Sequence, residues 1–293
     1  MDMSIQLLVS SLVIGGVYAL IALGFSMIYA STQVINFAQG EMAMLGGLLG
    51  VTFFSQLGLP YPVAFLLTLV SVGVVGLLFA KFAIEPLVHR KAHLHSLVIL
   101  TLAVAFLLQS TAELVWGKND LYAVPPLGDQ TIVILRASFV PQSFIVFAVV
   151  IVALALTWYF FGHTLTGKSF KAVALNRDAA RLMGIDVDRT VLLAFVLASA
   201  LGAAAGLAFS PIVTANAYMG MNLAIKGFAA AIIGGFGSSL GAIVGGLVLG
   251  FLEAFGAGYI SAGYRDAISF LVMLLVLLIR PAGLFGWASA GRV

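Results

Sequence analysis

Between Asp2 and Lys81 the chain carries a single charged side chain, that of Glu41. An ordinary soluble protein has about 25% charged residues. Here 9% of the 293 residues are charged and 62% are hydrophobic. Apolar runs of about 20 residues are long enough to cross the hydrocarbon of a bilayer as helices. The chain is therefore predicted to be an integral membrane protein that crosses the bilayer several times.

The apolar runs predict an all-α, polytopic helical bundle with about eight or nine membrane segments. The longest run is interrupted by glycines, which predicts at least one broken helix. No polar insertion approaches the roughly 40 residues that even a small stabilised domain needs. We therefore expect residues 1–293 to form one transmembrane permease-like domain. The candidate spans are residues 6–29, 37–57, 62–82, 95–116, 142–161, 190–213, 224–257 and 265–280.

Lysine and arginine gather in two polar segments, 83–94 and 162–189. Short loops rich in these residues stay in the cytoplasm, and the two spans between the segments give the parity that this placement requires. The segment 117–141, with Asp120, Pro125-Pro126 and Asp129, is then external, the N-terminus is outside and the C-terminus is inside. Confined to such loops, the basic residues indicate topology and not nucleic-acid binding.

Glu41 follows a sequence that is typical of a helix start. Asn36 can accept hydrogen bonds from the amides that follow it, and Gln39 completes a variant of the capping box. An ionised carboxylate within the membrane normally faces a bundle interior, a water-filled cavity or a partner. Asn36, Gln39, Gly40 and Glu41 are therefore candidates for the lining of a solute pathway. A purely structural carboxylate at the positive end of a helix is the other interpretation.

A glycine cluster divides the longest apolar run. Gly234, Gly235 and Gly237 each weaken a helix, by about 1 kcal/mol per residue. Broken helices at membrane depth tend to mark transport pathways, so these glycines are also candidate pathway residues. The regularly spaced glycines that follow are interpreted as helix packing.

Three further ionisable groups lie in apolar surroundings. We expect Lys226 to extend toward the interface, with a pair to Glu41 as the alternative. Glu113 and Glu253 lie near predicted helix ends, which favours contact with water over a proton relay.

His89, His93 and His95 are close together, but the neighbouring Arg90 and Lys91 repel cations. Neither a metal site nor a cofactor is expected, and the chain has no cysteine.

Residues 169–184 are predicted to form a short amphipathic cytoplasmic helix that Gly184 terminates. It is either an interfacial helix held by anionic lipid or a docking helix for a cytoplasmic partner. Polar and small residues that allow close approach favour docking. The candidate docking residues are Ala172, Asn176, Asp178, Ala180 and Gly184.

Over essentially its full length the chain resembles the LivH-type permease subunit of bacterial branched-chain amino acid ABC importers. Four segments carry the resemblance. They are Val34-Ile-Asn-Phe-Ala-Gln-Gly-Glu41, Ala174-Leu-Asn-Arg-Asp-Ala-Ala-Arg-Leu-Met-Gly-Ile-Asp-Val-Asp-Arg189, Lys226-Gly-Phe-Ala-Ala-Ala-Ile-Ile-Gly-Gly-Phe-Gly-Ser238 and Arg280-Pro-Ala-Gly-Leu-Phe-Gly286.

The resemblance implies a multi-pass subunit of the bacterial inner membrane that is not itself an enzyme. It implies a LivM-type second permease, two cytoplasmic ATPase subunits that use the ATP, and a periplasmic binding protein that delivers Leu, Ile or Val. The docking residues would then couple to an ATPase subunit. Permeases for urea, short amides or other amino acids carry similar motifs, and a self-contained secondary transporter is the alternative from another class.

Overall fold

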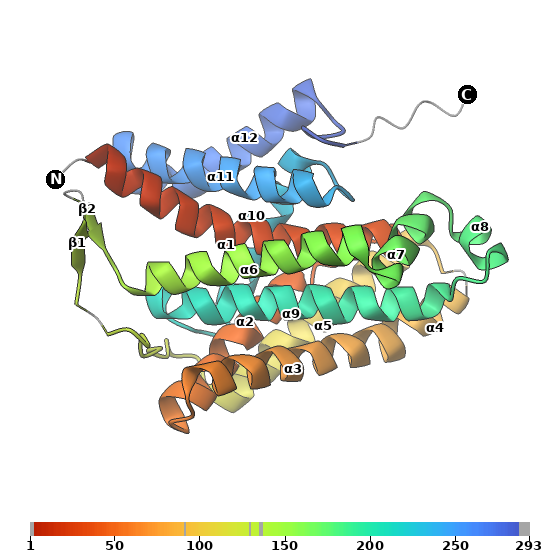
Figure 1. The fold of residues 1–293 in the computed structure, drawn as a ribbon, viewed down its shortest axis with the longest axis horizontal. Coiled ribbons are helices and arrows are strands. Elements are labelled where there is room, and N and C mark those ends of the chain that lie inside the picture. The colour runs from red at the N-terminus through yellow and green to blue at the C-terminus, as the bar shows by residue number, and fades with distance from the viewer. Residues whose placement is uncertain (1–2, 91, 129, 135–136, 287–293) are drawn as a thin grey trace.

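The computed structural model describes residues 3–90, 92–128, 130–134 and 137–286. In this part of the chain, seven helices are long and apolar enough to cross a membrane, and the polytopic helical class is confirmed. The predicted count of eight or nine segments is reached only when the shorter helical segments 39–56 and 219–234 are included. The long helices α1 (Met3–Thr32) and α9 (Val187–Val213) lie at the centre of the bundle and run in opposite directions (Figure 1). Both helices contribute buried residues to the main core, including Phe25 of α1 and Phe195 of α9.

Shorter and outer helices complete the bundle. Helix α2 (Gln39–Gly50) continues through a π-helical turn, η1 (Val51–Gln56), and α10 (Met219–Gly234) is also short. The outer helices and their extensions are α3 (Tyr61–Phe79), η2 (Ala80–Ile84), α4 (Glu85–His89), α5 (Leu94–Trp116), α6 (Gln142–His163), α11 (Ser239–Tyr259), η3 (Ala262–Tyr264) and α12 (Arg265–Ile279).

The polar segments lie at two opposite ends of the bundle. Helix α4, with α7 (Leu165–Leu175) and α8 (Arg177–Leu182), is at one end (Figure 1). At the other end is a small antiparallel hairpin, β1 (Ile132–Ile134) with β2 (Ala137–Phe139), in which Ile132 pairs with Phe139. Segments 83–94 and 162–189 therefore share one face of the membrane, as the parity argument required, and segment 117–141 lies on the other.

Each short helix packs along the long helix of the other half of the chain. Gly46 and Gly50 of α2 lie against Ala203 and Leu207 of α9, so these two helices run parallel. Likewise Phe228 of α10 packs on Phe25 of α1, and Tyr29, one turn further along α1, packs on Phe236 beyond the end of α10. Since α1 and α9 are antiparallel, α2 and α10 also run in opposite directions.

Candidate functional site

The two short helices begin with the same kind of turn. Gln33, after α1, and Thr214, after α9, have left-handed backbones with φ of 58° and 70°. This conformation is uncommon for residues with a side chain. Three residues after Gln33, Asn36 Oδ1 accepts the amide of Ala38 at 3.1 Å; two residues after Thr214, Asn216 Oδ1 accepts the amide of Tyr218 at 2.9 Å. Both turns lead the chain back into the bundle.

The helix starts meet at Gly40 and Gly220. A Cβ atom on Gly40 would lie 2.1 Å from the carbonyl oxygen of Gly220, and one on Gly220 would lie 2.3 Å from Oε2 of Glu41. Only glycine leaves room for such an approach of two backbones. The N-terminal ends of α2 and α10, which are the positive ends of the two helix dipoles, therefore converge beside the Glu41 carboxylate.

Glu41 is enclosed by protein. Its side chain is 2% exposed, and among the described residues its buried Oε2 has no hydrogen-bond partner. A buried polar group without a partner costs free energy, and a buried carboxylate costs more. In this position the Glu41 carboxylate can accept a hydrogen bond from a molecule that is not part of the chain, or pair with a cation.

The predicted capping box is wrong in its geometry. Helix α2 begins after Ala38, without a side-chain cap, and Asn36 instead closes the turn before it. The side-chain Nε2 of Gln39 donates a hydrogen bond to the carbonyl oxygen of Ala198 in α9 at 2.8 Å. Asn36 Nδ2 and Gln39 Oε1 are buried without partners in the described structure. Unsatisfied polar atoms therefore gather at the start of α2, where the pathway hypothesis places the solute.

The predicted helix break is present at Gly234–Gly237. Helix α10 ends at Gly234 and α11 begins at Ser239, and both Gly235 (φ 103°) and Gly237 (φ 81°) adopt left-handed backbones. The segment after α12 covers the break, since the amides of Leu284 and Phe285 donate to the carbonyls of Ile233 and Gly234 at 2.9 Å. Two of the four segments that carry the family resemblance, 226–238 and 280–286, therefore pack against each other.

The break is distant from Glu41. Gly220 and Gly234 are the two ends of α10, so they lie about 21 Å apart at 1.5 Å per residue. The structure therefore brings Asn36, Gln39, Gly40 and Glu41 together and leaves Gly234, Gly235 and Gly237 as a separate feature at the far end of α10. What the glycine cluster does in transport stays a prediction.

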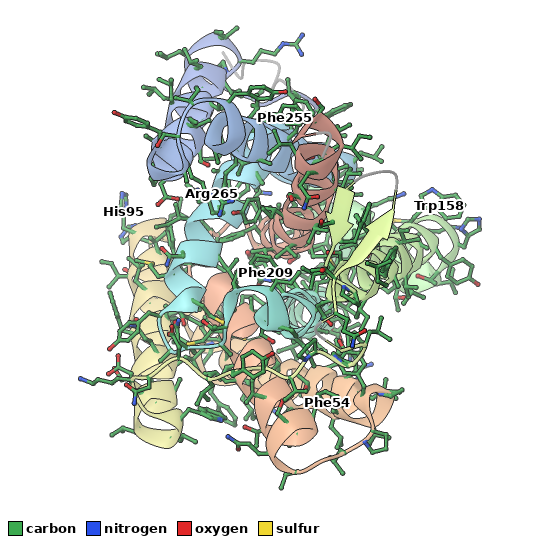
Figure 2. The ribbon with its side chains drawn as sticks, turned by 90° about the vertical axis from the view of Figure 1, so that its left-hand side faces the viewer. Phe54, His95, Trp158, Phe209, Phe255 and Arg265 are labelled. Atoms are coloured by element: carbon green, nitrogen blue, oxygen red, sulfur yellow. The ribbon has the colours of Figure 1, made fainter. Side chains whose placement is uncertain are left out.

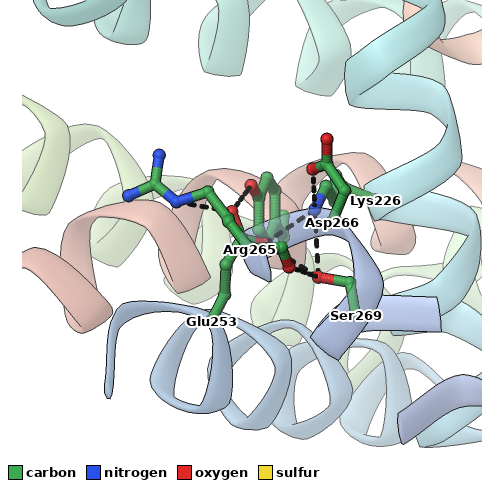
Figure 3. A network of polar contacts seen from close by, with 6 residues as sticks. Lys226, Glu253, Arg265, Asp266 and Ser269 are labelled. Carbon is green, nitrogen blue, oxygen red and sulfur yellow. Dashed lines mark hydrogen bonds and ion pairs between the residues drawn. The ribbon is translucent and has the colours of Figure 1, made fainter. Parts of the chain in front are cut away.

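A network of charges, with Lys226 and Glu253 buried and Arg265 and Asp266 exposed, joins four helices. Lys226 Nζ lies 3.1 Å from Glu253 Oε2 and 2.7 Å from Asp266 Oδ1, and Arg265 Nε lies 3.3 Å from Glu253 Oε1 (Figure 3). Tyr18 and Ser269 donate hydroxyl hydrogen bonds to Glu253, each at 3.1 Å. Two cations and two carboxylates balance, and the network connects α1, α10, α11 and α12.

This network corrects two expectations from the sequence. Lys226 is 8% exposed and does not extend to the interface, and its partner is Glu253 and not Glu41. Glu253 is 1% exposed, so contact with bulk water is also wrong. Each of the two charges is compensated by a residue of another helix that lies far along the chain. The pattern of residues along a single helix does not reveal such a partner.

At the basic end of the bundle, the predicted single helix over 169–184 is two helices. Asn176 divides them: its Oδ1 accepts the amides of Asp178 and Ala179, both at 3.0 Å, and so caps α8. Gly184, with φ of 81°, follows the end of α8 as expected. The two helices form a bend with Asn176 at its apex.

The proposed docking residues differ in exposure. Asn176, Asp178 and Gly184 are exposed and Ala172 is partly exposed. Ala180, however, is 3% exposed and packs with Val173 and Val187 inside the bend. The outer surface instead carries Leu182 and Met183, which are 88% and 82% exposed.

Arg177 connects this bend to α1. Its guanidinium donates two hydrogen bonds to the carbonyl oxygen of Ser31, in the last turn of α1. Burial, together with the neighbouring Arg181 cation, lowers the pKa of Arg177 from its usual value. This contact therefore links α8 to the helix that precedes the Asn36–Glu41 turn.

Sequence reasoning did not identify Ala198, Asn216 or Gly220 as part of the site. A signal was present, because Asn-x-x-x-Gly occurs twice, from Asn36 to Gly40 and from Asn216 to Gly220. A comparison of the two halves of the chain would have detected it.

Antiparallel halves, each with a short helix that starts inside the bundle, are typical of membrane transport proteins. The fold and the site together define a multi-pass helical transport permease. The family model described as "Branched-chain amino acid transport system / permease component" matches residues 7–277, so the chain belongs to this family. It is a transport component of the inner membrane and not an enzyme.

Relatives of known annotation match over nearly the whole chain. The chain is 30% identical to the high-affinity branched-chain amino acid transport system permease protein LivH of Escherichia coli K12, over 99% of the chain and 97% of the relative. It is 32% identical to BraD of Pseudomonas aeruginosa (99% and 98%) and 31% identical to a probable LivH of Methanocaldococcus jannaschii (98% and 95%).

Proposed function

We propose that the chain is the permease subunit of an ATP-driven importer for branched-chain amino acids, and that it forms one half of the translocation pathway. The observation that carries the proposal is the buried Glu41 carboxylate without a partner, located where the N-termini of α2 and α10 converge. The family and the printed names of the relatives support the substrate class.

The site matches the two charges that every amino acid carries. A substrate ammonium group would pair with Glu41 and thereby compensate its buried charge. The substrate carboxylate would accept hydrogen bonds from helix N-terminal amides, which favour anions. The partly buried rings of Phe37 and Phe228, with centroids 5.6 Å apart, lie next to this region and offer an apolar surface for an aliphatic side chain.

The remaining parts of the machine would be other chains. A LivM-type second permease would supply the opposite wall of the pathway, a periplasmic binding protein would deliver the substrate, and one of two cytoplasmic ATPase subunits would bind at α7 and α8. ATP-driven movement would reach the pathway through the contact of Arg177 with Ser31. No cofactor or metal is required of this chain, because the ATP is used by its partners.

The experiment is reconstitution. The chain, purified from native membranes with its bound partners, is placed in liposomes with ATP on the ATPase side, and uptake of radiolabelled leucine is measured with and without the binding protein. We expect uptake that requires both ATP and the binding protein. Uptake by the isolated chain along an ion gradient, without ATP, would show a secondary transporter instead.

The same assay separates amino acids from urea and short amides. Neutral amides have no ammonium group, so they gain nothing from a carboxylate such as Glu41. Competition of unlabelled leucine, isoleucine and valine, but not urea or acetamide, with labelled leucine is the expected result. Transport of urea in preference to leucine would contradict the proposed substrate class.

A further inference from the structure

A groove of about 470 Å³ opens at the basic end of the bundle, between α1, α6, α7 and the start of α11. Its wall contains Lys171 of α7, Ser238 and Ser239 at the beginning of α11, and Ser26 of α1. Most of the remaining lining is apolar. The lining of this groove contains no residue of the charge network and none of the site at Glu41.

The polar residues of the groove are suited to an anion. Lys171 is exposed, and no ion pair of this lysine occurs among the described residues. The first amides of a helix have no intrahelical acceptor. Ser238 Oγ accepts a hydrogen bond from the amide of Gly241 at 3.0 Å. The amides of Ser239 and Leu240 remain available for a bound anion at the positive end of this 21-residue helix. Such a helix end favours a phosphate.

Ser26 points independently to a bound molecule. Its side chain is 1% exposed, lines the groove, and has no hydrogen-bond partner for its Oγ among the described residues. Ser26 lies six residues before the end of α1 at Thr32, about 9 Å deeper along the helix axis. A molecule in the groove therefore needs a charged head at the surface and a hydrogen-bond acceptor below it.

A second, apolar groove lies beside the first. This groove of about 560 Å³, between α3, α6 and α9, shares Met27 and Thr157 with the first. Its lining is almost entirely hydrocarbon and aromatic, including Leu197 and Leu201. The two grooves therefore lie on either side of Met27 and Thr157, and the membrane face beside the cationic head site is apolar.

Trp158 sets the depth of the head site. It lines the first groove, is 68% exposed, and stands at the outer edge of the bundle in Figure 2. Tyr159 and His163 stack beside it. Tryptophan and tyrosine gather at the level of the lipid headgroups, so the groove opens at the headgroup layer of the leaflet that faces α7 and α8.

We propose that this groove binds an anionic phospholipid of the cytoplasmic leaflet. The headgroup phosphate lies between Lys171 and the start of α11, Ser26 donates a hydrogen bond to an ester carbonyl of the lipid, and one acyl chain lies along the apolar lining of the same groove. Basic pockets between membrane helices on the cytoplasmic side recognise lipid headgroups in this way.

The test uses Trp158 as a reporter. The chain contains three tryptophans, and replacing Trp116 and Trp287 by Phe leaves Trp158 alone. This variant is reconstituted in vesicles of phosphatidylcholine in which increasing fractions are replaced by phosphatidylglycerol with brominated acyl chains. Quenching of Trp158 fluorescence then gives the affinity of the groove for phosphatidylglycerol relative to phosphatidylcholine. We expect a clear preference for phosphatidylglycerol.

Matched variants separate the groove from general attraction to the surface. Lys171→Gln should reduce the preference about fivefold, the contribution of one cation near an anionic membrane. Lys168→Gln, on an exposed lysine of the same helix that does not line the groove, should leave it unchanged. Ala174→Phe, at an exposed groove residue, should reduce the quenching by both lipids because its ring fills the groove.

Two results would overturn the proposal. Equal preference for the two lipids in the parent variant, or equal losses in Lys171→Gln and Lys168→Gln, would show that the groove does not select a headgroup. Loss of lipid quenching when the native assembly is reconstituted would show that a partner protein covers this face. Circular dichroism of each variant verifies that its helices are intact.

Discussion

Gly40 and Gly220 pack backbone against backbone where two antiparallel short helices begin, so that a Cβ atom on Gly40 would lie 2.1 Å from the Gly220 carbonyl oxygen. This approach holds the two helix starts together beside Glu41. Each glycine belongs to a different half of the chain, and each half packs its short helix on the long helix of the other. The contact therefore ties the two halves at the candidate pathway.

Gly40→Ala should destabilise the fold, because the added methyl group meets a backbone atom that cannot move without shifting α10. Overpacking of this kind costs about 1–3 kcal/mol, which exceeds the gain of about 1 kcal/mol in helix propensity. The measurement is the temperature at which the purified protein loses its monodisperse peak in size-exclusion chromatography. Gly162→Ala is the control, because nothing lies within 4 Å of the new Cβ. A Gly40→Ala protein as stable as this control would contradict the close packing.

Glu41→Gln should preserve the fold and reduce transport. Glutamine has the same shape and is less costly to bury than a carboxylate, so thermal stability should be unchanged or higher. The proposed ammonium partner is lost, and we expect leucine uptake to fall at least tenfold, as the loss of about 1.4 kcal/mol or more would produce. Reconstituted uptake with ATP and binding protein measures the effect. Normal uptake would leave Glu41 with a structural role only.

Gly220→Ala tests the same site from the other helix. The new Cβ would lie 2.3 Å from Glu41 Oε2, the end of a side chain and not a backbone atom. The carboxylate can move away, so the loss of stability should be smaller than in Gly40→Ala, while leucine uptake should fall with the displacement of Glu41. Unchanged uptake together with unchanged stability would show that the position of the carboxylate is not critical.

The sequence was sufficient to predict the membrane class, the broken helix and the common face of the basic segments. Apolar length and charge distribution determine these properties locally. Partners across helices were not predictable, because the compensation of Lys226 by Glu253 depends on how α10 and α11 pack. The bend at Asn176 could have been predicted from the sequence, since asparagine is among the best N-cap residues. At Gln39, a tertiary acceptor, the Ala198 carbonyl, replaced the local capping partner.

Glu253→Leu should strongly destabilise the protein, because Lys226 and Arg265 both lose a buried partner. Breaking a buried ion pair by removing one member costs about 3–5 kcal/mol. The double variant Glu253→Leu with Lys226→Met should recover part of this loss, since it removes the buried ammonium group that would otherwise have only the exposed Asp266 carboxylate as its ion-pair partner. Thermal denaturation of the two single variants and the double variant gives their coupling. Additive losses would show that the two charges act independently. The control is Arg189→Ala, because Arg189 forms an exposed pair with Asp186. Its loss should change the free energy of unfolding by less than about 1 kcal/mol.

Asn176→Ala should uncouple ATP hydrolysis from transport. Without the Asn176 side chain the amides of Asp178 and Ala179 lose their acceptor, and loss of an N-cap costs about 0.5–2 kcal/mol. Helix α8 has only six residues, so this cost is enough to loosen the bend that carries Arg177 toward Ser31. In the reconstituted assembly we expect ATP hydrolysis to continue while leucine uptake per ATP falls.

Asn176→Asp distinguishes the cap from a direct contact with an ATPase subunit. Aspartate caps a helix as well as asparagine does, and its charge is favourable at the N-terminus of α8. If the cap is what matters, Asn176→Asp should couple nearly as well as the native chain, and the second permease should co-purify in normal amounts with both variants. Equal defects in both variants would instead assign Asn176 to the docking surface itself, because the amide group is then required and not the cap. Full coupling in Asn176→Ala would remove this bend from the path of energy transmission.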